Sequence, residues 1–272
     1  MTMQTMNRLI RSVCAAAVTS AGMATLQASA ENWSVASGSF TNTANWDTGT
    51  VPTNGAWAVI DNAGTALMDG GTVMCSCLFP GYSSAGAIVQ SGGSITVTAG
   101  MDPDVGVGYL ATGAGTYAMS GGSLSVPNGN FQIGGRGTGS FTQTGGAVTG
   151  GGYVVIGRYG PAGNGALTVS GGEFNQSRSD RNLIVAEGGV GSLTVTNAGL
   201  VSVNGGLRIS QVKNGTGDVG TGTGTVYLCR GGTISTPNVH TLGGSSTFYF
   251  DGGVLSARSS GQTYGAFMQG LS

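Results

Sequence analysis

A polar residue followed by two glycines returns along this chain at nearly regular intervals. The second glycine of each copy, including the degenerate copy TNAGL, stands at these positions: Gly71, Gly93, Gly122, Gly146, Gly172, Gly199, Gly232 and Gly253. The seven steps between Gly71 and Gly253 average 26 residues. A period of this length is typical of one coil of a β-solenoid and too short for a propeller blade. The repeat therefore constrains the fold more than any other feature of the sequence.

Apolar residues recur at fixed distances from each glycine marker. Two residues after the marker, all eight copies are apolar: Val73, Ile95, Leu124, Val148, Phe174, Val201, Ile234 and Leu255. A second segment midway between markers has this expected inward column: Val107, Ile133, Ile156, Val185, Ile209 and Leu242. A third segment precedes each marker and has two expected inward columns: Ile88, Tyr117, Phe141, Leu167, Leu193, Tyr227 and Phe248, then Gln90, Met119, Gln143, Val169, Val195, Cys229 and Phe250. Because side chains two apart in a strand share a face, each coil is predicted to hold three short, half-buried strands.

The glycine pairs are expected at corners between strands. Glycine adopts positive φ without a Cβ penalty, and corners of successive coils lie above one another, where bulk would collide. The preceding hydroxyl residue, such as Ser170, is expected to hydrogen-bond local backbone at the corner and is not a nucleophile by default. The sequence thus predicts an all-β, single-stranded parallel β-helix with three strands per coil.

The composition supports this fold and excludes several classes of protein. The chain has 54 glycines among 272 residues and only 8% charged residues, against about 25% in typical domains. Disordered chains combine low hydrophobicity with high net charge, whereas this one is 39% hydrophobic with a net charge of -1. Ten basic residues face eleven acidic ones without a basic run, so no nucleic-acid partner is expected.

The first thirty residues resemble a secretory signal. Arg8 and Arg11 precede a small, apolar stretch, and Ala28-Ser29-Ala30 supplies an A-x-A cleavage site. A membrane anchor is the alternative, but the stretch falls short of the ~20 apolar residues that span a bilayer. The chain is expected to have four parts. Residues 1–30 are the signal peptide, and residues 31–70, with all three tryptophans, form an N-terminal cap and the first strands. Residues 71–256 form the β-helix, and residues 257–272 begin a further, truncated repeat module.

Three cysteines follow the expected signal: Cys75, Cys77 and Cys229. An odd number is a poor disulfide framework for an exported chain. The spacing Cys75-x-Cys77 lacks the second half of a zinc site. Burial as small hydrophobic residues is therefore the favoured interpretation.

The pattern resembles the repeat of bacterial surface and exported proteins that carry autotransporter-type passengers or PEP-CTERM sorting signals. The resemblance rests on GNGALTVSGG and NFQIGG, on the opening W33…N45-W46…V51-P52, and on the end FDGGVLSARSSGQTYGAFMQGLS, which is similar to the lead-in to autotransporter-associated β-strand repeats. It implies a right-handed, pectin-lyase-like parallel β-helix at or beyond the outer membrane. Membrane attachment would then depend on a C-terminal region that this sequence lacks.

The main enzymatic alternative is a polysaccharide lyase or hydrolase, because parallel β-helices often carry such sites along one face. These sites need clustered carboxylates for Ca²⁺ or for acid/base chemistry. The nearest cluster is Asp102 and Asp104, in a lengthened loop, which could share a calcium ion but are interpreted first as solvated turn residues. Asp180 and Arg181, near Arg178, are interpreted as a solvated polar loop.

Two further features are candidate sites. His240, the only histidine, is expected where other coils have Leu183 or Leu207, as a structural imidazole. The stretch from Gly220 to Thr225 resembles a phosphate loop only in composition, because it lacks the lysine and the following helix.

A third alternative is recognition of glycans or ice by an outward ladder of Thr142, Thr168 and Thr194, with Ala118 and Leu228 at its ends. The leading hypothesis is an exported, adhesin-like structural protein that forms a rigid rod for surface display. It is expected to have no catalytic residues and no cofactor. The expected partners are surface glycans or other copies of the chain.

Overall fold

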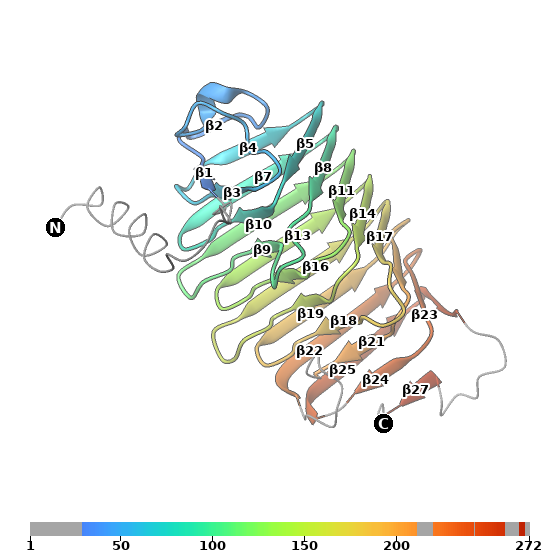
Figure 1. The fold of residues 1–272 in the computed structure, drawn as a ribbon. Coiled ribbons are helices and arrows are strands. Elements are labelled where there is room, and N and C mark those ends of the chain that lie inside the picture. The colour runs from blue at the N-terminus through green and yellow to red at the C-terminus, as the bar shows by residue number, and fades with distance from the viewer. Residues whose placement is uncertain (1–28, 211–219, 242, 259–266, 270–272) are drawn as a thin grey trace, which may run out of the picture.

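The computed structural model describes residues 29–210, 220–241, 243–258 and 267–269. These residues form a parallel β-solenoid of about eight coils, with one short 3-10 helix, η1 (Thr43–Asn45). Most of the expected signal, and most of residues 257–272, lie outside the described residues. The coils stack into a rod with strands of successive coils side by side (Figure 1). The prediction of an all-β parallel solenoid is confirmed.

Three sheets run along the rod, and from β3 to β26 each coil contributes one strand to each in the order sheet 1, sheet 2, sheet 3. Sheet 1 consists of β1 (Ser29–Asn32), β3 (Ala56–Ile60), β6 (Cys77–Pro80), β9 (Val105–Val107), β12 (Phe131–Ile133), β15 (Val154–Ile156), β18 (Leu183–Val185), β21 (Leu207–Ile209), β24 (Val239–Thr241) and β27 (Met268–Gln269). Sheet 2 consists of β2 (Ser37–Ser39), β4 (Thr65–Met68), β7 (Ala85–Gln90), β10 (Ala114–Met119), β13 (Thr138–Gln143), β16 (Asn164–Val169), β19 (Val190–Val195), β22 (Gly220–Cys229) and β25 (Gly243–Asp251). Sheet 3 consists of β5 (Thr72–Cys75), β8 (Ser94–Val97), β11 (Ser123–Val126), β14 (Ala147–Gly150), β17 (Glu173–Gln176), β20 (Leu200–Val203), β23 (Thr233–Thr236) and β26 (Val254–Ala257).

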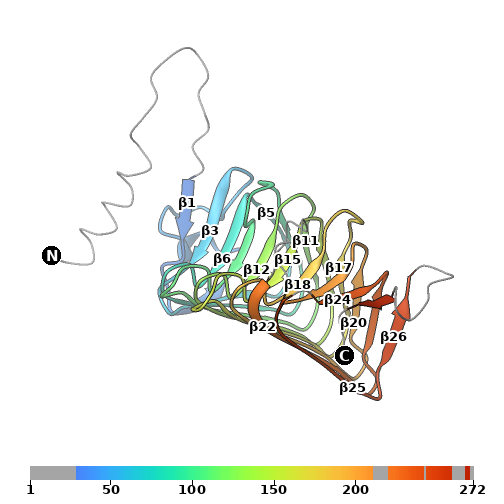
Figure 2. The ribbon, with the colours of Figure 1, turned by 90° about the horizontal axis from the view of Figure 1, so that it is seen from below.

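Figure 2 shows the three sheets around the interior of the rod. Most residues of the expected inward columns are buried in the core there. All eight residues after the markers align in one column of sheet 3, from Val73 to Leu255. In sheet 2, Tyr117 and Phe141 are neighbours in register and their rings stack at 4.7 Å between centroids. Phe141 is fully buried and also meets Phe131 and Phe174 edge to face. The apolar period of the sequence therefore becomes one continuous core.

The expected columns were wrong by one residue in the coil that contains β22. Val226, not Tyr227, aligns with Leu193, and Leu228, not Cys229, aligns with Val195. The corner after β22 holds four residues between Leu228 and Thr233, whereas the corner at Ser170 holds three between Val169 and Glu173. Counting back a fixed number from the glycine pair therefore selected the wrong face of the strand.

A second shift affects sheet 1. Thr241, not Leu242, aligns with Ile209, and Leu242 lies outside the described residues. Consequently His240 aligns with Arg208 rather than with Leu207, which pairs with Val239. The expectation that His240 replaces a leucine of the inward column was wrong.

The glycine pairs lie at corners, as the repeat predicted. Gly172 has a φ of 74°, and a Cβ at Gly171 would collide with the carbonyl oxygen of Thr144 in the preceding coil. The Ser170 hydroxyl does not bond local backbone as expected: it lies 3.4 Å from the carbonyl oxygen of Gln143, one coil earlier, and donates to it. The corner residues thus serve the stacking of coils.

The two ends of the solenoid differ. At the N-terminal end, β1 and β2 extend two sheets, and Trp33 and Phe40 pack edge to face on Trp46. At the other end, Phe250 aligns with the buried Leu228 yet is 58% exposed, because no described strand lies beyond β25 in sheet 2.

Candidate functional site

The main polar cluster of the described residues lies on the outer face of sheet 1. The middle residue of each three-residue strand points away from the core, as Gln132 does in β12. Gln132 and its neighbour Val155 are nevertheless fully buried, so other parts of the chain cover this face. Charged side chains from loops in three coils meet here.

Arg158, which follows β15, is the centre of this cluster. Its Nη1 and Nη2 donate to Asp102 Oδ1 at 2.5 Å and Oδ2 at 2.9 Å, a bidentate ion pair. Its Nε donates to Glu187 Oε2 at 3.0 Å. Gln132 Nε2 donates to Asp102 Oδ1 at 2.8 Å. The guanidinium is thus held by two carboxylates, one from an earlier and one from a later coil.

The electrostatics match this pairing. The Arg158 side chain is only 6% exposed, and burial alone would lower its pKa. The hydrogen bond and charge of Asp102, together with the charge of Glu187, outweigh burial and hold the pKa of Arg158 above its ordinary value. The guanidinium therefore stays charged, and both carboxylates form charge-assisted hydrogen bonds with it.

A tyrosine extends the cluster towards solvent. The guanidinium groups of Arg136 and Arg158 lie over the Tyr159 ring, 4.4 Å and 4.5 Å from its centroid. Burial raises the pKa of Tyr159, although Arg158 opposes the shift. The ring is therefore neutral at ordinary pH and acts as a packing surface for two cations.

Asp104 is the second carboxylate of the expected calcium pair, and the structure gives it partners of its own. It is fully buried and accepts backbone N–H bonds from Gly100 at 2.9 Å and Met101 at 2.5 Å. Burial raises its pKa, while these bonds and one from Gly129 lower it in part. Because Ca²⁺ takes six to eight oxygen ligands, the N–H donors around Asp104 and the arginine at Asp102 are unlike the surroundings of a calcium ion. Among the described residues, no group of three or more His, Cys, Asp or Glu side chains could hold a metal ion.

The polar loop at Asp180 is a surface feature. Arg178 and Arg181 lie 2.9 Å and 2.8 Å from Asp180 Oδ2, and all three side chains are substantially exposed. The hydrogen bond from Arg178 lowers the pKa of Asp180. The solvated interpretation from the sequence agrees with this position.

The glycine-threonine stretch from Gly220 to Thr225 belongs to β22 and pairs with β19 and β25, so it is a strand and not a loop. Cys75 and Cys77 are fully buried, and Cys229 is partly buried. Burial raises the pKa of Cys77 to about 12, so its thiol stays protonated and unreactive.

The threonine ladder exists. Thr142, Thr168 and Thr194 are neighbours in register on the outer face of sheet 2. Ala118 precedes them as expected, but Tyr227, not Leu228, follows them. The error has the same cause as the shift of the β22 columns.

An aromatic cluster on the outer face of sheet 1 was not anticipated from the sequence. Phe79 lies 5.4 Å from Trp57, 5.1 Å from Tyr82 and 5.6 Å from Tyr109 between ring centroids. All except Phe79 are partly exposed. The four residues come from three coils and do not stand at a fixed distance from the glycine markers. The only signal in the sequence that could have predicted the cluster is that all four lie on the same side of the coil.

Comparison of the chain with protein-family models, with curated proteins and with solved structures gave no match. In the described part of the chain, no helix has the length and apolar character needed to cross a membrane.

Proposed function

We propose that this chain is an exported structural repeat protein whose β-helical rod serves surface display in an adhesin-like role, as in the bacterial surface proteins that its repeat resembles. The observation that supports this proposal most strongly is the uninterrupted core. Inward columns continue in register through the three sheets, so the repeated part of the sequence forms one stiff rod.

The polar cluster is consistent with a structural role. A general base or nucleophile needs a group that can reach substrate. Arg158 and Glu187 are largely buried and bound to each other, and Asp102 binds Arg158 through both oxygens. These ion pairs join loops of separate coils.

Export is tested by expressing the full chain in a Gram-negative host and fractionating the cells. We expect protein outside the cytoplasm whose N-terminus follows Ala30, since the signal would be removed there. The matched control, Ala30→Arg, should block processing. Recovery of unprocessed wild-type chain in the cytoplasm would refute this part of the proposal.

An enzymatic function is the first alternative, because Asp102, Arg158 and Glu187 bring two carboxylates and a cation together on the outside of a β-helix. It predicts release of reducing or unsaturated sugar from pectin, alginate or xylan. Such activity, if it is lost in Asp102→Ala and retained in Asp180→Ala, would contradict the structural proposal. We expect no release by either variant or by the wild type.

A glycan-binding module is the second alternative, and the cluster of Trp57, Phe79, Tyr82 and Tyr109 favours it, since exposed aromatic rings can pack on sugar rings. A glycan array with the full chain tests it. Saturable binding that Tyr82→Ala and Tyr109→Ala remove, and that Tyr249→Ala on another sheet keeps, would establish a module in place of a passive rod.

A further inference from the structure

The outer face of sheet 2 is a long, continuous surface without charge. Its strands lie side by side along the rod, in register from β4 to β25 apart from one shift between Gly220 and Thr223 (Figure 1). In the described strands of this sheet, the only charged residue is Asp251, at the end of β25. The outward side chains are small, hydroxylated or apolar, with one amide at Asn164.

These side chains form three columns. The first column is Ala85, Ala114, Thr138, Asn164, Val190, Thr223 and Ser245. The second is Thr65, Ala87, Thr116, Ser140, Ala166, Ser192, Thr225 and Thr247. The third is Leu67, Val89, Ala118, Thr142, Thr168, Thr194, Tyr227 and Tyr249.

Exposed apolar side chains gather on this face. Of the nine large hydrophobic residues that are exposed in the described chain, five belong to these columns: Leu67 at 38%, Val89 at 41%, Val190 at 47%, Tyr227 at 39% and Tyr249 at 53%. A concentration of exposed apolar groups on one uncharged face is typical of an interaction surface.

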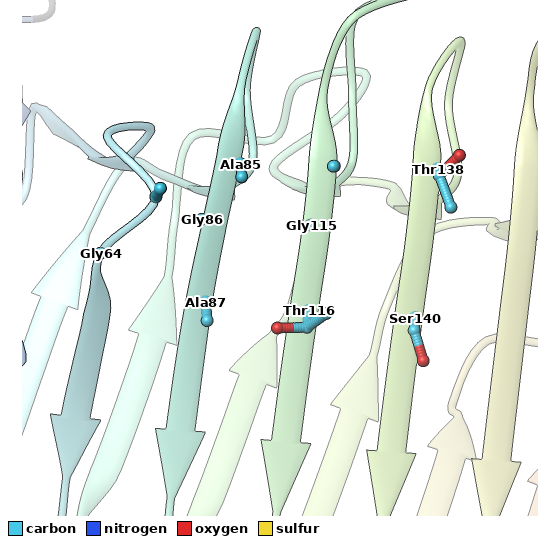
Figure 3. Close-up of a pocket in the computed structure, with 10 residues that line it drawn as sticks. Gly64, Ala85, Gly86, Ala87, Gly115, Thr116, Thr138 and Ser140 are labelled. Atoms are coloured by element: carbon cyan, nitrogen blue, oxygen red, sulfur yellow. The ribbon is translucent and has the colours of Figure 1, made fainter. Parts of the chain in front are cut away.

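The face is hollow towards its N-terminal end. A shallow hollow of about 320 Å³ lies over β7, β10 and β13 and is lined by small residues, among them Ala85, Ala87 and Gly115 (Figure 3). Thr116 and Ser140 border it with their hydroxyls. Ala114, in the middle strand, belongs to the same lining.

Larger side chains project from this face towards its C-terminal end. Val190 stands in the first column on β19, and Tyr227 and Tyr249 end the third column on β22 and β25. The two tyrosine rings stack at 5.0 Å with an interplanar angle of 9°. The first column thus changes from small residues at Ala85 and Ala114 to Val190, and the third column carries apolar side chains at both ends, Leu67 and Val89 at one and the two tyrosines at the other.

We propose that this face binds the same face of a second copy of the chain, with a two-fold axis parallel to the strands. That rotation keeps each column opposite itself and reverses the order of the coils, so β4 faces β25, β7 faces β22, β10 faces β19, and β13 faces β16. Each interface is then self-complementary, as two-fold symmetry requires.

The pairs that this rotation creates fit in size and polarity. Val190 faces Ala114, in the centre of the hollow. Tyr227 faces Val89, so an exposed aromatic residue meets an exposed apolar one. Near the axis, Thr142 faces Thr168, and hydroxyl meets hydroxyl. No charged side chain of the columns is desolvated.

The size of the face suits a dimer. Eight strands about 4.8 Å apart and six residues of about 3.3 Å each give roughly 750 Å² per copy. A standard stable interface buries about 800 Å² per partner. A flat glycan surface is less suited, because Tyr227 and Tyr249 cover one face of each other's rings.

Sedimentation velocity of the full chain over a concentration series tests the proposal, with circular dichroism to verify folding. We expect a reversible dimer. Val190→Lys should weaken it by roughly 100-fold or more, because a charge would be buried in the hollow of the partner. The matched control is Met74→Lys on sheet 3, which replaces an apolar residue of similar exposure, 46% against 47%, and should leave the dimer intact.

Cross-linking tests the direction of the axis. Ala118 and Thr194 face each other between copies, so a mixture of Ala118→Cys and Thr194→Cys chains should give dimers with a short bismaleimide. Either variant alone should not, because its two new thiols lie about 17 Å apart across the interface. The wild type controls for the native cysteines.

Two results would overturn the proposal. The first is a monomer at every concentration. The second is a monomer that binds a polysaccharide surface or ice through this face, shown by loss of that binding in Val190→Lys and its retention in Met74→Lys. Neither result bears on export or display of the rod, so failure of this inference is distinguishable from failure of the proposed function.

Discussion

The Arg158 guanidinium binds both carboxylate oxygens of Asp102, which lies 56 residues earlier in the chain. Asp102 precedes β9 and Arg158 follows β15, so the pair spans strands of successive coils on the outer face of sheet 1. Glu187, 29 residues after Arg158, extends the connection by one more coil. The charged residues that interrupt the repeat thus connect coils that the repeat itself only stacks.

Removal of this arginine should destabilise the rod. Arg158→Met keeps an apolar stem but leaves Glu187, which is 13% exposed, and Asp102 without their cation. We expect a loss of about 2–3 kcal/mol, below the ~3–5 of a fully buried pair because Asp102 is 35% exposed. Chemical denaturation measures the loss. Asp180→Asn, in an exposed pair, is the control and should cost less than about 1 kcal/mol.

The inward aromatic column should be the most sensitive part of the core. Phe141→Ala removes a fully buried ring that contacts Tyr117, Phe131 and Phe174. We expect a loss of about 3–5 kcal/mol in the free energy of unfolding. Thr142→Ala, the adjacent outward residue, should change it by less than about 0.5 kcal/mol. Equal effects of the two substitutions would contradict the assignment of the two faces.

One substitution should stabilise the protein. Ala186 has a φ of 64° at the corner after β18, where the equivalent residue of the preceding coil, Gly157, has a φ of 70°. Because alanine is strained there, Ala186→Gly should raise the free energy of unfolding by about 0.5–1 kcal/mol. The reciprocal Gly157→Ala should destabilise, since its Cβ would collide with the carbonyl oxygen of Val190. A loss of stability in Ala186→Gly would show that the corner is unstrained.

Asp104 should make stability depend on pH. Burial raises its pKa in the folded protein above the value of 3.8 that applies to the unfolded chain. The folded state therefore binds the proton more tightly, and this contribution to stability falls as pH rises from about 3.8 through the raised pKa. The free energy of unfolding of the wild type, minus that of Asp104→Asn, should be larger below this window than above it. A difference that grows with pH would mean that the N–H bonds dominate over burial.

The period of the sequence was sufficient to predict the solenoid and most of its core. Residues such as Ile133 and Ile156 stack in adjacent coils because the apolar spacing sets which face of a strand is buried. The prediction failed at β22, where the four-residue corner before Thr233 was counted as a three-residue corner. A shift by one residue turns a strand over, so Tyr227 lies on the outer face and Val226 in the core.

The candidate site could be predicted only in part. The loop at Asp102 was recognisable as an interruption of the repeat, but neither Arg158 nor Glu187 follows from it in sequence. Whether these side chains come into contact depends on how many coils separate them and on which side of the rod the loop that carries each of them lies.

The sequence by itself determined that this chain is a three-sheet parallel solenoid, because a repeated pattern of apolar residues and corner glycines can bury its inner face only by stacking on itself. The tertiary structure alone decided what the outside of the rod presents. The ion pair of Asp102 with Arg158 joins residues that stand outside the repeat, and the extent of the uncharged face of sheet 2 depends on which strands lie in register, so both arise only when separate coils are brought together.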